Sequence, residues 1–253
     1  MKILAIGLNA FREAIRDKVL LNLLFFALAL VVGAGVLSTL TVGERNKIIV
    51  DLSLAAMNIV GALMAIFLGI SLVSKEIDRR TIYNILSKPV RRYEFLLGKY
   101  LGLAITLGVN TALMALLAAA IFPLMGEPLP DGLWLPVGMI YLEMLVVVAG
   151  SLLFSTFTTT TLGAVFSVAI YLMGHLSGPL LQMAQASTGA ARTLGLALYY
   201  LLPNFDNFNY KPYALRLETV PDGMICASLG YGVLYITFVL SLAILIFQRR
   251  EFK

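Results

Sequence analysis

Two side chains with acid–base chemistry lie inside long apolar stretches of this sequence. Glu143 lies within 135–157, and His175, the only histidine, lies within 162–183. A titratable group in such a stretch is costly and marks a candidate functional site. Both residues are nearly equally far from the turn at 158–161, so an antiparallel helical hairpin would hold them at matching depth. We therefore predict that they face each other or a shared polar cavity.

Asn58 and Tyr171 complete the set of intramembrane polar residues that could line a path. Two alternatives stay open for this set. Each side chain could hydrogen-bond separately to backbone or water and hold helices together. An intramembrane hydrolase could use His175 with Ser177 or Glu143, although residues two apart on a helix point about 200° apart, which is poor geometry for pairing His175 with Ser177.

Composition decides the class of protein that positions these groups. Of 253 residues, 60% are hydrophobic and 13% charged, and the mean hydropathy is +0.90. Soluble domains carry about 25% charged residues. One cysteine and one histidine exclude an internal disulfide and a multi-histidine metal site. We expect a single all-α transmembrane domain over 1–253 that contains no cofactor and binds no nucleic acid.

Six apolar runs are long enough to cross a bilayer as helices, which takes about 20 residues each. The predicted spans are Val19–Leu40, Leu52–Ser74, Tyr100–Pro123, Leu135–Phe157, Leu162–Met183 and Met224–Phe247. With both termini in the cytosol, fourteen of the 19 basic residues fall on the inner side. The positive-inside rule therefore predicts a multi-pass membrane protein with its N- and C-termini in the cytosol.

Three segments lie outside the predicted spans. Residues 1–18 repeat apolar side chains at helical spacing (Leu4, Leu8, Phe11, Ile15), which predicts an amphipathic helix in the membrane interface. The alternative is a plain extension of the first span. Residues 75–99 form a basic cytosolic loop. Residues 184–223 form an outer segment, for which we expect short re-entrant or surface helices followed by an aromatic loop with interface anchors at Tyr199, Tyr200, Phe205, Phe208, Tyr210 and Tyr213.

The cytosolic loop has features of a docking helix. Ile82, Ile85 and Leu86 form a small apolar face, and Pro89 ends the helix. This pattern favours docking on a soluble partner, and the alternative is a solvated basic loop. The chain has no GxxxxGK[ST] phosphate loop, so any energy source must come from another chain or an ion gradient.

The same region resembles the permease subunits of type-2 ABC exporters, a class that includes the nitrous-oxide-reductase maturation permease and G-subfamily drug exporters. The resemblance rests on motifs that begin at Glu76 and end in the PNFDNFNY stretch from Pro203; between them lie Arg80-Thr81, Leu86 to Pro89 and Leu97-Gly98-Lys99. Arg80 departs from many relatives, which carry glycine there.

The resemblance implies a homodimeric permease in the lipid of the bacterial cytoplasmic membrane, driven by separate ABC ATPase subunits that bind ATP and Mg²⁺. Spans two and five, with help from span one, would line the path, and a periplasmic partner could contact the outside. The coupling helix and its flanks would dock on the ATPase through Glu76, Arg79, Arg80, Ile82, Tyr83, Ile85 and Leu86. A non-transporting membrane assembly factor is the remaining alternative.

Overall fold

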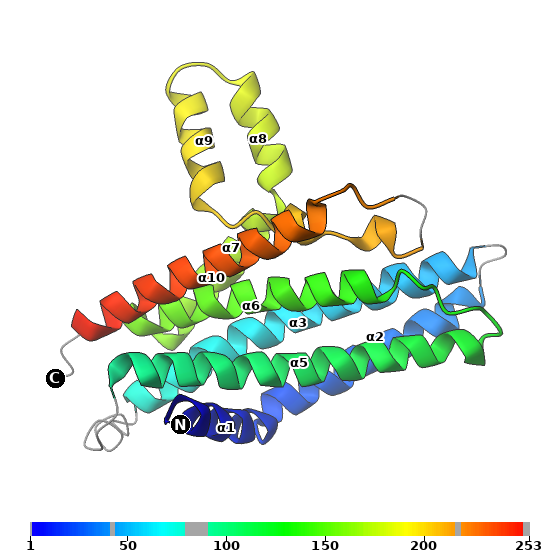
Figure 1. The fold of residues 1–253 in the computed structure, drawn as a ribbon, viewed down its shortest axis with the longest axis horizontal. Coiled ribbons are helices and arrows are strands. Elements are labelled where there is room, and N and C mark those ends of the chain that lie inside the picture. The colour runs from blue at the N-terminus through cyan, green and yellow to red at the C-terminus, as the bar shows by residue number, and fades with distance from the viewer. Residues whose placement is uncertain (1, 41–43, 79–90, 216–218, 250–253) are drawn as a thin grey trace.

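Long helices lying side by side make up the computed structural model, which describes residues 2–40, 44–78, 91–215 and 219–249 (Figure 1). Both termini lie at one end of this bundle, here called the terminal end. The elements in order are α1 (Lys2–Ile15), α2 (Lys18–Ser38), α3 (Arg45–Asp78), α5 (Arg92–Leu124), α6 (Trp134–Phe157), α7 (Thr160–His175), α8 (Ser177–Ala186), α9 (Ala190–Leu201), η1 (Phe205–Phe208), η2 (Lys211–Tyr213) and α10 (Met224–Arg249).

Five of these helices are long and apolar enough to cross a membrane: α2, α3, α5, α6 and α10. The sixth candidate is the pair α7 and α8, which bends by 65°. All regular elements within the described residues are helical, so the prediction of an all-α integral membrane protein is confirmed. The central helix is α3, which packs against α2, α5, α6 and α7.

The predicted fifth span, Leu162–Met183, is not one straight helix. The chain breaks at Leu176, between α7 and α8. Pro179 has no N–H to donate to the carbonyl of His175, and its ring would clash with that carbonyl in a continued helix. At about 1.5 Å per residue, the 16 residues of α7 cover only about 24 Å, so α7 alone is shorter than a typical hydrocarbon core.

The N-terminal segment forms its own helix, α1, rather than an extension of the first span. α1 ends in a turn that is closed by hydrogen bonds from the backbone N–H groups of Arg16 and Asp17. The Asp17 carboxylate then accepts the backbone N–H of Val19 at 2.9 Å, which stabilises the start of α2. Leu4, Leu8 and Ile15 are exposed on α1, as a helix lying in a lipid interface requires.

The other face of α1 packs closely against α5 through residues without bulky side chains. Gly7, Ala10 and Ala14 are buried there. At Gly102 an added Cβ would lie 2.5 Å from the carbonyl oxygen of Gly7, and at Gly98 it would lie 2.6 Å from the Cβ of Ile6. Glycines at this spacing let two backbones approach closely in a membrane.

An ion pair fixes the same contact. The Lys99 ammonium lies 3.0 Å from the Glu13 carboxylate, and the Lys99 side chain is only 2% exposed. Lys99 is the last residue of the predicted cytosolic loop 75–99, and it lies in the second turn of α5, which begins at Arg92. The start of α5 is stabilised because the backbone N–H of Arg91 donates to Glu94 Oε2 at 2.7 Å.

The segment between α9 and α10 differs from the expected interface loop. Phe205, Phe208 and Tyr210 are at most 2% exposed, so they belong to the core and are not interface anchors; Tyr200, by contrast, is 80% exposed. The reason is that η1 packs over α6, α7 and α8, which removes its aromatic rings from the surface. We call the end of α7 that η1 covers the capped end.

A short helical hairpin, α8 and α9, projects sideways from the bundle (Figure 1). The two helices pack on each other where Gly195 meets Ala184, and no residue of α9 is buried. α9 lies in the outer segment 184–223, where a short helix was expected, whereas α8 is formed mostly by residues of the predicted fifth span.

Candidate functional site

The four predicted intramembrane polar residues lie together near the capped end. Asn58 comes from α3, Glu143 from α6, and Tyr171 and His175 from α7. His175 Nε2 lies 3.3 Å from Glu143 Oε1, so the predicted juxtaposition of these two side chains is present in the structure. A role for the four residues in a transport path stays a prediction.

Hydrogen bonds orient each member of this group. The Tyr171 hydroxyl donates to Asn58 Oδ1 at 2.6 Å, and Asn58 Nδ2 donates to Glu143 Oε2 at 2.8 Å. The Asn58 amide is therefore engaged on both sides and joins α3, α6 and α7. This is the interhelical role that buried amides commonly have in membranes.

Glu143 is the most demanding member of the group because it is only 2% exposed. Among the described residues its second oxygen, Oε1, has no hydrogen-bond partner, even though His175 Nε2 lies nearby. A buried carboxylate oxygen in an apolar bundle requires a donor or a proton. Glu143 Oε1 is therefore the atom of this site that still requires a hydrogen-bond donor or a proton.

Aromatic rings cover the polar group from the capped end. The His175 ring centroid lies 4.6 Å from that of Tyr171 and 5.2 Å from that of Phe205. Phe205 reaches this position because Gly174 has no side chain; a Cβ there would lie 2.5 Å from the Phe205 ring. The rings keep Glu143 and Asn58 out of contact with lipid.

A cavity of about 50 Å³ lies between these residues and the segment around η1 and η2. A water molecule needs at least about 10–15 Å³ of such volume, so a few waters or one small ion would fit. Its walls are Asn58, Pro136, Ile140, Glu143, His175, Phe205, Asp206, Phe208, Asn209, Tyr210 and Lys211. In the described residues, no group of three or more His, Cys, Asp or Glu side chains is placed to hold a metal ion.

The cap over this cavity depends on residues that sequence reasoning did not single out. Asp206 Oδ2 accepts the backbone N–H of Gly178 and lies 3.1 Å from the Ser177 hydroxyl. The backbone N–H of Asn204 donates to the Tyr231 hydroxyl at 2.8 Å. The Asn-Phe-Asp sequence after Pro203 was the available signal, since Asn and Asp side chains commonly bond nearby backbone in turns.

These contacts weigh against the hydrolase alternative. The Ser177 hydroxyl lies 2.7 Å from Asn204 Oδ1 and 3.1 Å from Asp206 Oδ2, so it is directed at the cap. The hydrolase alternative would need the His175 ring within hydrogen-bond reach of this hydroxyl, as the base that activates the serine. The structure pairs His175 with Glu143 and with the Tyr171 carbonyl instead.

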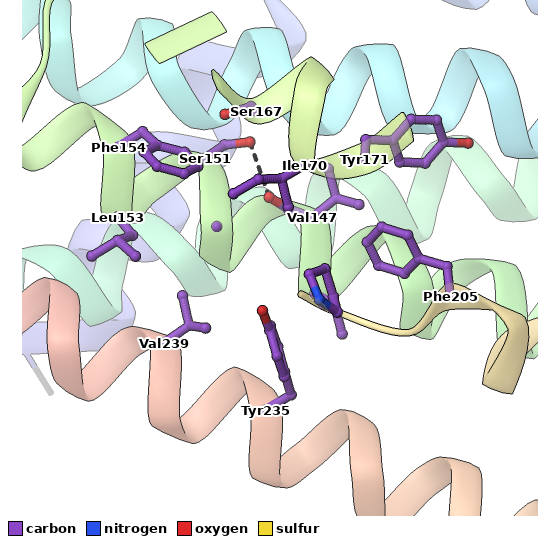
Figure 2. Close-up of a pocket in the computed structure, with 13 residues that line it drawn as sticks. Val147, Ser151, Leu153, Phe154, Ser167, Ile170, Tyr171, Phe205, Tyr235 and Val239 are labelled. Atoms are coloured by element: carbon purple, nitrogen blue, oxygen red, sulfur yellow. Dashed lines mark hydrogen bonds between the residues drawn. The ribbon is translucent and has the colours of Figure 1, made fainter. Parts of the chain in front are cut away.

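A second, mostly apolar pocket of about 60 Å³ lies between α6, α7 and α10 (Figure 2). Tyr171 and Phe205, which also contact the polar group, form one wall of this pocket, and Tyr235 enters it from α10. The Ser151 hydroxyl on its wall donates to the Val147 carbonyl at 2.9 Å, so it is used within α6.

The residues predicted to dock on the ATPase lie at the end of α3 and in the segment between α3 and α5. Glu76 belongs to α3, but its side chain falls outside the described part. The other six residues of the predicted set fall in 79–90, a segment outside the described residues. They are Arg79, Arg80, Ile82, Tyr83, Ile85 and Leu86.

A family model described as ABC-2 family transporter protein matches residues 4–252. The chain belongs to this ABC-2 transporter family. The resemblance to type-2 ABC permeases is thereby confirmed, and the ABC-2 match makes the chain a membrane permease of an ABC transporter. A specific likeness to the nitrous-oxide-reductase maturation permease stays a prediction. A search of curated proteins found no match.

The geometry of this ABC-2 permease predicts a measurable role for the Tyr171 hydroxyl. Tyr171→Phe leaves the Asn58 carbonyl without its donor, so we expect a loss of about 1 kcal/mol in the free energy of unfolding. Thermal unfolding in lipid nanodiscs measures this. Tyr200→Phe is the matched control, since the Tyr200 side chain is 80% exposed. Equal stability of the two variants would contradict the prediction.

Proposed function

We propose that the chain is the membrane subunit of an ATP-driven exporter, and that a separate subunit binds and hydrolyses ATP with Mg²⁺. The observation that carries this proposal is the family match over 4–252 in a chain whose sequence contains no phosphate-binding loop. Membership in a family of ABC transporters favours ATP over an ion gradient, and without a phosphate loop in this chain the ATP site belongs to a partner.

The partner surface in this proposal is the segment between α3 and α5. Those are the two longest helices among the described residues, with 34 and 33 residues, and both reach the terminal end. The basic residues favour placing this end in the cytosol. The interfacial helix α1 is joined to α5 by the Lys99–Glu13 ion pair, so a displacement of the start of α5 would also move α1.

A test of the proposal starts from native membranes. The tagged chain, captured in mild detergent, should bring with it a Mg²⁺-dependent ATPase activity. Removing Mg²⁺ with EDTA should abolish that activity and restoring it should recover the rate, because the metal neutralises the developing phosphate charge. The chain expressed alone in a foreign host should show none. Hydrolysis by the isolated chain, or a captured chain without ATPase, would contradict the proposal.

The second element of the proposal is a homodimer formed around α3. One stripe of α3 stays open to the surface at spacings of three to four residues, while its other faces are buried. The stripe runs through Leu52, Ala55, Ile59, Leu63, Phe67 and Ser71. The flanking helices α2 and α7 also expose apolar side chains, so a second copy could pack here and enclose a path between the two α3 helices.

Cysteine cross-linking tests the dimer. In a Cys226→Ser background, which removes the only native thiol, Phe67→Cys should give a covalent dimer with a short bismaleimide. Leu234→Cys on α10 is the control, because this side chain is 73% exposed yet α10 packs on α6, away from the stripe. Equal or stronger cross-linking through Leu234→Cys would contradict the proposed interface.

A further inference from the structure

The contacts of His175 determine which of its ring nitrogens carries a proton. His175 Nδ1 lies 3.1 Å from the backbone carbonyl oxygen of Tyr171. A carbonyl oxygen only accepts hydrogen bonds, so Nδ1 must be the donor. In a neutral imidazole the other nitrogen, Nε2, then has no hydrogen and is an acceptor.

Nε2 faces a second acceptor. It lies 3.3 Å from Glu143 Oε1, while the other carboxylate oxygen, Oε2, already accepts the Asn58 amide at 2.8 Å. The Asn58 amide supplies no donor to Oε1, because its nitrogen donates to Oε2 and its oxygen accepts the Tyr171 hydroxyl at 2.6 Å. A neutral imidazole and a carboxylate would therefore oppose two lone pairs at this contact.

We propose that Glu143 and His175 together bind one proton at the Oε1–Nε2 contact, and that this proton ties α6 to α7. Binding takes the proton from a hydronium ion and leaves water. The occupied pair has no net charge, either as carboxylate and imidazolium or as carboxylic acid and neutral imidazole. In both forms one N–H or O–H group donates across the contact, which gives Oε1 the partner that it otherwise lacks among the described residues.

Burial favours the occupied form. The Glu143 side chain is 3% exposed and the surrounding bundle is apolar, so an uncompensated carboxylate there is costly. The His175 side chain is 37% exposed and lines the cavity under η1 and η2. A proton therefore has a route to the pair from the capped end without crossing the bundle.

The other titratable and charged groups around the pair are already engaged or lie at its edge. On α7 the Tyr171 hydroxyl is bound to Asn58, and Tyr210, before η2, pairs with the Ser228 hydroxyl at 2.9 Å. Asp206 of η1 accepts from Gly178, and Lys211 of η2 lines the cavity. The described part of α3 contributes only neutral Asn58 to the cavity walls. The Glu143–His175 contact is thus the proton site of this cavity.

The proposed proton has a mechanical consequence at the end of α7. Only Gly163, Ser167 and Gly174 of α7 are fully buried, so apolar packing holds this helix weakly. The polar contacts of Tyr171 and His175 are what fix its capped end to α3 and α6. Loss of the proton would remove one of these ties and leave α7 freer to move away from α6.

The single histidine makes a direct test possible. The full chain, purified through a histidine-free tag, is labelled with ¹⁵N-histidine and placed in lipid nanodiscs, so that every imidazole signal belongs to His175. We expect protonated Nδ1 at all pH values at which the protein is folded, and Nε2 in a hydrogen bond with a carboxyl group. A neutral ring protonated at Nε2 instead of Nδ1 would overturn the proposal without any variant.

Glu143→Gln supplies the second measurement. Its amide can donate to Nε2 and accept from Asn58, but it cannot exchange a proton with the ring. We expect the proton affinity of His175 to change by at least about tenfold, as removal of a carboxylate in contact implies. Asp222→Asn, which removes an exposed carboxylate of the connecting segment, should leave it unchanged. An equal titration of His175 in wild type and Glu143→Gln would overturn the shared proton.

Discussion

Gly102→Leu should release α1 from α5 and cost about 3 kcal/mol or more of stability. A Cβ at this position would lie 2.5 Å from the Gly7 carbonyl oxygen, 2.6 Å from the Ala10 Cβ and 3.1 Å from the Phe11 nitrogen. Two of these atoms are backbone and cannot swing away, so the helices must separate. Overpacking typically costs about 1–3 kcal/mol, and rigid neighbours place this site at the upper end.

Two measurements check this result. Thermal unfolding should move to a lower temperature, and trypsin should cut faster at Arg12 and Arg16 once α1 leaves its site. Gly138→Ala is the matched control, because a Cβ there meets nothing within 4 Å and alanine favours the helix. Protection of α1 in Gly102→Leu equal to that in the control would show that the close α1–α5 contact is not required.

Glu143→Leu should be the most damaging single change in the polar group. Leucine has a similar size but leaves the buried Asn58 amide without its acceptor and removes the contact with the partly exposed His175 ring. An unsatisfied buried group costs about 1–3 kcal/mol, and partial rearrangement in the membrane reduces this cost. We expect a loss of about 2 kcal/mol in the free energy of unfolding.

Glu143→Gln is the control for this prediction, because the amide keeps an acceptor for Asn58 and a donor for His175. Its stability should stay within about 0.5 kcal/mol of wild type, the range of changes that break no specific interaction. If leucine and glutamine were equally tolerated at position 143, the polar group would not hold α3, α6 and α7 together.

Much of this site could be predicted from the sequence for one geometric reason. Glu143 and His175 are nearly equally far from a tight turn, and an antiparallel hairpin places such residues at about the same depth. What the sequence could not supply is helix rotation, which depends on packing against other helices. Here α3 provides Asn58, whose amide bridges to Glu143 and Tyr171.

The differences between prediction and structure also have tertiary causes. Hydropathy treats 162–183 as one span because most residues there are apolar or small, but Pro179 breaks the helix after His175. The aromatic residues after Pro203 fit an interface anchor equally well by composition. Their burial depends on a short α7, which leaves room for Phe205 beside Gly174.

The most direct test of the proposed ATPase-driven permease is capture of the ATPase by variants of the segment between α3 and α5. On a helix, Ile82 and Leu86 share the predicted apolar face and Asn84 lies about 200° from Ile82. The double change Ile82→Asp and Leu86→Asp should reduce the captured Mg²⁺-ATPase activity at least about tenfold, as loss of apolar anchors in a docking face implies. Asn84→Asp should capture as much as wild type. Undiminished ATPase capture by the double variant, inserted in the membrane at wild-type level, would contradict the account.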